Sequence, residues 1–266
     1  MNKSLLFVFV LVFLTSCSSY QKLLRSDDVA KKYTAADSLY KMGKYKKALP
    51  LMEQIVPAYR GKPQAEPLMF RYANTFYQLE DYYLSGYQFE RFVTSYPKSD
   101  SLEVAAFRSA KSYYELSPRY SLDQKDTYTA LEKLQEFVDR FPNSTYRSNA
   151  NVMVAELREK IEKKDFETAS QYLRISDYKA AIESFENFIA DHPGSKFRQD
   201  AFYGRLEASY LLAINSVPYL VKDRLSQSKK YYDSYLKYYS DGSLRPEADE
   251  ISQDVEKRLA QFTTEN

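Results

Sequence analysis

Residues that could carry out acid–base, nucleophilic or metal chemistry are few in this sequence. The chain has 1 His and 1 Cys, which excludes the usual Cys and His zinc sites and argues against thiol or Ser-His-Asp catalysis. The carboxylate pairs Glu156/Glu159 and Glu183/Glu186 have helical spacing beside Lys and Arg, as on a solvated helix face. Neither GxGxxG nor GxxxxGK[ST] occurs. The sequence therefore predicts a protein that is not an enzyme and binds no metal or other cofactor.

The single histidine has a structural explanation in the sequence. His192 lies in DHPGSK, and the same pattern recurs as SYPKSD and RFPNST with Tyr96 and Phe141 in its place. In each copy the aromatic residue would pack under a helix end, the proline would stop the helix, and the serine would cap the next one. We therefore expect His192 to be a turn residue and not a metal ligand or a general base.

The first residues predict a secretion signal. Lys3 leads into an apolar run from Leu5 to Leu14, and ten residues of helix extend about 15 Å, too short for a bilayer core of roughly 30 Å. We expect residues 1–16 to be a signal peptide. The sequence Leu14-Thr15-Ser16-Cys17 resembles the bacterial lipobox, which implies that Cys17 carries a covalent lipid as the new N-terminus; an ordinary signal peptide with a chance cysteine is the alternative.

The resemblance to lipoproteins also implies a location. Ser18 follows Cys17, and no acidic residue occurs before Asp27; by the sorting rules of such proteins this favours the outer membrane, with the chain lipid-anchored and facing the periplasm. The net charge of +2 gives no reason to expect nucleic-acid binding.

Helical hairpins are expected over the rest of the chain. Scarce glycine, 6 residues, argues against a β-rich fold. Residues 165–195 show the pattern best: small Ala169 and Ala181 fall where two helices approach closely, and Pro193 ends the second helix. Apolar side chains recur there at helical spacing, namely Tyr178, Ala181, Phe185, Phe188 and Ile189. The sequence thus predicts an all-α solenoid of about five hairpins similar to tetratricopeptide (TPR) repeats.

The predicted organisation has four parts. Residues 17–29 form a polar tether, residues 30–147 hold repeats 1–3, and residues 148–262 hold a linking helix, repeats 4–5 and a capping helix. The linking helix is expected because Gly and Pro are absent from Ser148 to Arg174, a length of roughly 40 Å at 1.5 Å per residue. Eight extra residues in repeats 3 and 5 predict longer loops around 117–124 and 215–225, which either contact partners or are inert turns.

A scaffold of this kind binds partners along the groove built from the first helix of each hairpin. Aromatic side chains mixed with Asn, Gln and Lys suit an extended or C-terminal peptide. About half of the tyrosines could instead pack between repeats. The candidate groove residues are Tyr33, Asp37, Tyr40, Lys41, Phe70, Asn74, Tyr77 and Gln78.

Together the lipobox, the five hairpins, the exits SYPKS, RFPNS and DHPGS, and the segment YLRISDYKAAIESFENFIADHPGS resemble the BamD family of the outer-membrane β-barrel assembly machinery. The resemblance covers nearly the whole mature chain. It implies that the C-terminal repeats dock on a BamA-type β-barrel insertase and that the N-terminal groove meets unfolded outer-membrane protein precursors. By position in the repeat array, the insertase contact would involve Arg198, Tyr203, Arg205 and residues 215–225.

Two other classes of lipoprotein are alternatives. One is a periplasmic TPR adaptor that coordinates envelope or peptidoglycan processes, although such adaptors commonly carry a coiled-coil segment and no sustained heptad run precedes these repeats. The other is a nutrient-binding lipoprotein of the SusD type, for whose large ligand region this chain has no room.

Overall fold

The computed structural model describes residues 19–264 of the chain. The predicted signal peptide and the predicted lipid site at Cys17 lie outside the described residues. No strand occurs between residues 19 and 264, so the predicted all-α class is confirmed. Within this range no helix is both long and apolar enough to cross a bilayer.

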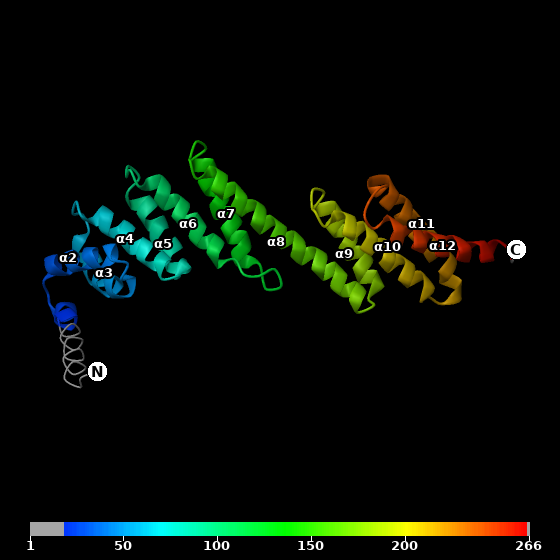
Figure 1. Cartoon of the computed structure of the whole chain (residues 1–266), viewed down its shortest axis with the longest axis horizontal. Helices are drawn as coiled ribbons and strands as arrows, with labels where there is room; N and C mark the ends of the chain where they lie inside the picture. Colours follow the sequence, from blue (N-terminus) through cyan, green and yellow to red (C-terminus); the bar gives the residue numbers. More distant parts are fainter. Residues whose placement is uncertain (1–18, 265–266) are drawn as a thin grey trace, which may run out of the picture. The chain divides into compact units, whose positions relative to one another are not determined.

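The described residues form a succession of helices that Figure 1 shows in chain order. Residues 19–25 are helical. The labelled helices after them are α2 (Val29–Lys41), α3 (Tyr45–Tyr59), α4 (Ala65–Gln78), α5 (Tyr82–Ser95), α6 (Leu102–Leu116), α7 (Lys125–Arg140), α8 (Arg147–Arg174), α9 (Tyr178–Asp191), α10 (Arg198–Ile214), α11 (Pro218–Tyr239) and α12 (Arg245–Thr264).

The turns inside the hairpins share one design. Gly43, Glu80 and Ser176 each adopt a positive φ, of 70°, 62° and 63°, just before the second helix of their hairpin. In two of these turns an aspartate follows and caps that helix: the backbone N–H of Leu84 donates to Asp81 and that of Ala180 to Asp177. The left-handed residue reverses the chain and the aspartate satisfies a free N–H group at the helix start.

The exits between hairpins also repeat. Ser99 accepts a hydrogen bond from the backbone N–H of Ser101, and Ser195 accepts one from that of Phe197. Ser101 and Phe197 are themselves the N-cap residues of α6 and α10, so the prediction that Ser99 and Ser195 cap the next helix is wrong, and these serines hold the turn before it. Ser99 also donates to Glu66 of the preceding first helix, with 2.5 Å between the two oxygens. His192, in the same turn as Ser195, lies 3.0 Å from a carboxylate oxygen of Asp165 and packs its ring on Phe188. His192 is therefore part of the turn, as its place in the motif predicts.

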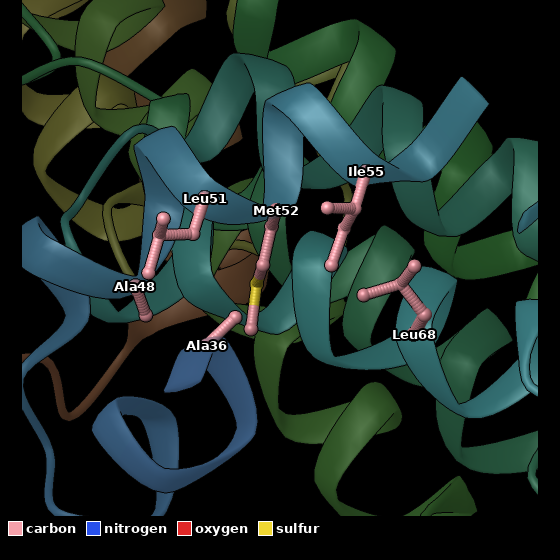
Figure 2. Packing of buried hydrophobic residues seen from close by; sticks show 6 residues of the cluster. All are labelled: Ala36, Ala48, Leu51, Met52, Ile55 and Leu68. Atoms are coloured by element: carbon pink, nitrogen blue, oxygen red, sulfur yellow. The ribbon is translucent and has the colours of Figure 1, made fainter. Parts of the chain in front are cut away.

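Small apolar cores form where helices of neighbouring hairpins meet. Figure 2 shows the first, in which side chains of α2, α3 and α4 point toward one another. Ala36 is 1% exposed and lets α2 approach α3 closely, while the larger side chains fill the space between the helices. Its buried members are Ala36, Ala48, Leu51, Met52, Ile55 and Leu68.

The chain divides into two compact units. The first unit comprises the described residues up to Pro118 together with Gln124–Val154, and the second comprises Arg119–Asp123 and the described residues from Ala155 on. Helix α8 begins in the first unit and ends in the second. The predicted long helix joining the N- and C-terminal halves is thus confirmed over 28 residues.

Three local expectations differ from the structure. The predicted tether is helical over 19–25, and Tyr20 donates to the carbonyl of Lys47 while packing against the first core. Pro57 is expected from its residue type to close the first hairpin's second helix, but it lies inside α3, which continues to Tyr59. The expected loop around 215–225 spans only 215–217, since Pro218 has the φ that suits a first helical position and starts α11.

Candidate partner-binding surfaces

The first helices of the first unit carry polar side chains that bond to one another from repeat to repeat. Arg71 of α4 donates to Asp37 of α2. Asn74 of α4 donates to the hydroxyl of Tyr40 of α2 at 2.6 Å, and Arg108 of α6 donates to the amide oxygen of Asn74. Each of these pairs is separated by 34 residues, the length of one helical-hairpin repeat.

Asn74 is the centre of this arrangement. It is 5% exposed, and both its amide nitrogen and its amide oxygen are bonded, so its orientation is determined by two neighbouring helices. Burial raises the pKa of Tyr40, and the hydrogen bond from Asn74 acts against that rise. Tyr40 is therefore a neutral acceptor at neutral pH.

Tyr77 continues the arrangement toward the end of α4. Its hydroxyl donates to Glu115 at 3.3 Å, and the edge of its ring meets Tyr82 at 5.3 Å between centres. The ammonium of Lys111 lies 5.6 Å and the guanidinium of Arg108 6.0 Å from the ring centre. We call the whole set the polar row: Asp37, Tyr40, Arg71, Asn74, Tyr77, Arg108 and Lys111.

The polar row carries more positive than negative charge. Its arginines and lysine face one carboxylate within the row, Asp37, which also pairs with exposed Lys41 at 2.7 Å. Arg108 donates to a neutral amide and lies against a neutral ring. Gln78, the next residue after Tyr77, is exposed. The surface therefore offers cations and aromatic rings to a partner.

Six of the eight candidate groove residues thus lie in or beside the polar row, and two lie elsewhere. The ring of Tyr33 packs against Tyr59 at 5.0 Å. The ring of Phe70 meets both Phe89 and Phe92 at 5.5 Å, in an apolar cluster of the first unit. Tyr33 and Phe70 therefore pack between helices. Packing of this kind is the alternative to a place in the groove for aromatic residues of a helical repeat.

Three members of the polar row were not predicted from the sequence: Arg71, Arg108 and Lys111. They lie 34 residues after Asp37, Asn74 and Tyr77. Adding one repeat length to each predicted groove residue would have found all three.

The candidate residues of the second unit fall in different surroundings. Arg205 is 8% exposed, lies 4.4 Å above the ring of Tyr231 and 3.7 Å from Glu186, and donates to Ser234. Burial lowers the pKa of its guanidinium, and Glu186 acts against this. Arg205 therefore joins α9, α10 and α11 together.

Arg198 and Arg205 share a neighbour, because the guanidinium of Arg205 also lies 5.1 Å from the ring centre of Phe202. The guanidinium of Arg198 lies 5.0 Å from the ring centres of both Phe202 and Tyr238. Tyr203 packs in the cluster that contains Ala248 of α12. Burial, followed by the charge of Glu207, raises the pKa of Tyr203 to about 12.

The start of α11 presents apolar side chains to solvent. Tyr219 is 80% exposed and Val217 is 49% exposed. Behind them Arg224 donates to the hydroxyl of Ser216, which donates to the carbonyl of Leu212 at 2.5 Å. The turn is thus held from inside while its apolar residues point outward, as in a contact surface.

No group of three or more His, Cys, Asp or Glu side chains lies close enough to hold a metal ion in the part of the chain that the structure describes. The polar row and the start of α11 offer aromatic rings and cations, which are groups that bind a protein partner.

Comparison with known proteins places the chain in a family. The family model YfiO, described as outer membrane lipoprotein, matches residues 25–219. The chain belongs to this family. The match includes the whole polar row and ends at the exposed Tyr219.

One curated protein is similar to part of this chain. The outer membrane protein assembly factor BamD of Caulobacter vibrioides is 25% identical over 128 residues, which are 47% of this chain and 42% of the relative. The chain thus spans less than half of that relative's length. Among solved structures, the TPR2AB domain of yeast Sti1 in its pHSP90 complex is 14% identical, with a TM-score of 0.40, 86% of this chain covered and 98% of that chain.

Proposed function

We propose that this protein is a non-catalytic scaffold of outer-membrane β-barrel assembly, anchored by a lipid on Cys17 and facing the periplasm. Membership of the outer membrane lipoprotein family and the similarity to an assembly factor support the process. In this proposal, the first unit binds unfolded barrel precursors and the second unit docks on a BamA-type insertase.

The observation that carries the proposal is the polar row. It runs across three successive first helices at a 34-residue interval and combines aromatic rings with cations and one bidentate amide. An extended chain segment is held well by such a surface, since rings pack on its side chains and cations meet its carboxylates. Asn74 and Arg71 are held in place by neighbouring helices, so binding costs little side-chain conformational entropy.

The proposed insertase contact is the apolar start of α11. Tyr219 and Val217 are exposed, whereas Arg205 is buried. We therefore assign the direct contact to Tyr219 and Val217 and give Arg205 the role of holding α10 against α11. An exposed aromatic side chain on a fixed helix start is the type of residue that dominates binding energy at protein interfaces.

Site-specific photo-crosslinking in cells tests both assignments. A photoreactive amino acid at Gln78 should capture barrel precursors during their synthesis, and one at Tyr219 should capture a large β-barrel protein with a periplasmic domain. Exposed Glu53 on the second helix α3 is the matched control and should capture neither. Capture of peptidoglycan enzymes at Gln78 or Tyr219, with no barrel protein, would replace the assembly role by that of a periplasmic adaptor.

A further inference from the structure

A hollow of about 340 Å³ lies on the first unit, and its lining contains no residue of the polar row. Helices α5 and α7 form its walls and α6 forms its floor. Its apolar lining includes Phe137 and Phe141, and small side chains of α6 leave it open. The residues that line it are Glu90, Val93, Thr94, Ala106, Ser109, Ala110, Lys133, Glu136, Phe137, Arg140 and Phe141.

The second unit contains the same three-helix arrangement in α9, α10 and α11. The turn motifs place Tyr96 opposite His192, so the residue of α10 that corresponds to Ala106 is Phe202. The buried positions of α7 and α11 correspond in the same way, with Phe141 opposite Tyr239. The second unit therefore shows which side chain fills the position that the hollow occupies in the first unit.

In the second unit the ring of Phe202 fills the space that corresponds to the hollow. Phe202 is 2% exposed, and its ring centre lies 5.3 Å from Tyr238 and 5.5 Å from Tyr239. The guanidinium of Arg198 lies 5.0 Å from its centre. The guanidinium of Arg205 lies 5.1 Å from it as well, so a ring there meets two other rings and two cations.

In the first unit the corresponding ring is absent and its surroundings remain in part, since Leu102 and Ser109 stand where Arg198 and Arg205 do. Ala106 supplies only a methyl group, while Phe141 stands where Tyr239 does and Arg140 stands where Tyr238 does. The guanidinium of Arg140 already lies 5.4 Å from the ring of Phe141. A second ring entering the hollow would have Phe141 and Arg140 as neighbours.

One charged side chain of the hollow, Arg140, is placed to meet an acidic neighbour beside that ring. Lys133 pairs with Glu90 at 3.0 Å and with Glu136 at 3.2 Å, so one ammonium is shared by two carboxylates. Arg140 forms no ion pair with any described residue. The four charged side chains of the lining sum to zero, and Arg140 is the one among them that lacks an ion pair and can meet a partner's carboxylate.

We infer that this hollow is a docking site for a partner protein segment that inserts an aromatic side chain next to an acidic residue. A protein segment fits because the α5 face that lines the hollow extends beyond it: Glu90, Tyr87 and Tyr83 follow at helical spacing. Tyr83 is 67% and Tyr87 49% exposed. The walls of the site lie on the second helices α5 and α7, its floor lies on the first helix α6, and none of its lining residues belongs to the polar row.

A fluorinated dipeptide tests the inference on the full-length lipidated chain in detergent. The probe is N-acetyl-aspartyl-(4-fluorophenylalanine) amide, followed by fluorine NMR. Saturable line broadening is expected with the natural chain. The affinity for the probe should fall at least about tenfold in Ala106→Phe, because the added ring fills the hollow from within the chain. Ala155→Phe adds a ring at an exposed position of α8 and is the matched control that should bind normally.

Arg140→Gln keeps the hollow open and tests the role of the positive charge. It provides an independent test if Ala106→Phe fails to fold. The natural chain should prefer the aspartyl probe over its lysyl counterpart by about tenfold, and this preference should disappear in Arg140→Gln. Absence of saturable binding to the natural chain, or equal binding by a folded Ala106→Phe variant, would overturn the inference. An unchanged preference in Arg140→Gln would overturn the acidic part of it.

Discussion

Tyr113, Glu90 and Lys133 show how one buried hydroxyl depends on its charged neighbours. Tyr113 donates to Glu90 at 3.2 Å, and Lys133 lies 5.9 Å from its ring centre. Burial, then the charge of Glu90 and the hydrogen bond to it, raise the pKa of Tyr113 to about 12. The neutral hydroxyl is therefore the form that the folded state favours.

This shift predicts a loss of stability at high pH. Because the folded-state pKa lies above the unfolded value of about 10, the stabilisation is complete below pH 10 and disappears as the pH rises toward 12. Denaturant unfolding between pH 9 and 11.5 should show a smaller loss of stability in Tyr113→Phe than in the natural chain. Tyr128→Phe, at an exposed position of α7, should behave as the natural chain does. Parallel curves for the natural chain and Tyr113→Phe would contradict the assignment.

At the scale of the helices, close approach depends on a few small residues. Ala169 of α8 and Ala181 of α9 are both 0% exposed and belong to one apolar cluster with Phe185 and Phe188. Gly204 of α10 approaches the same cluster, where a Cβ atom would lie 2.5 Å from the ring of Phe185. These positions leave no room for a larger side chain.

Ala181→Arg is therefore expected to destabilise the second unit strongly. A charge forced against the neighbouring helix without a partner costs on the order of 3 kcal/mol or more. Thermal or denaturant unfolding measures the effect. Ala190→Arg, at an exposed position of the same helix, should change stability by less than about 0.5 kcal/mol. Equal unfolding curves for the two variants would show that Ala181 does not lie in a tight contact.

Helix ends were harder to predict than helix faces. Pro218 was expected within a long loop, yet it begins a helix of 22 residues. The eight extra residues of the third hairpin form the connection 117–124, whereas those of the fifth hairpin lengthen its helices. Both hairpins have the same number of extra residues, so their prolines explain the different outcome. Pro218 occupies a first helical position, which favours helix, whereas Pro118 follows the end of a helix.

For the whole molecule, the proposed anchor lies outside the described residues and the binding surfaces lie within them. Cys17→Ala should therefore release the protein from the outer membrane without changing the fold. Fractionation of cells measures the first effect, and helical circular dichroism with a melting curve of the purified variant measures the second. A variant that still sediments with outer membranes at high salt would show that a lipid on Cys17 is not the main anchor.

The sequence by itself determined the all-α class, the succession of helical hairpins and the long helix α8, because helical periodicity, turn residues and the lack of Gly or Pro act locally. It also located Asp37, Tyr40 and Asn74 on the face where the polar row lies. Only the tertiary structure decided that Phe70 and Arg205 are packed inside, that Arg71 and Arg108 complete the row, and that Ala106 leaves a hollow which Phe202 fills in the second unit. Those outcomes depend on contacts between residues far apart in sequence, and the periodicity of a single helix carries no information about them.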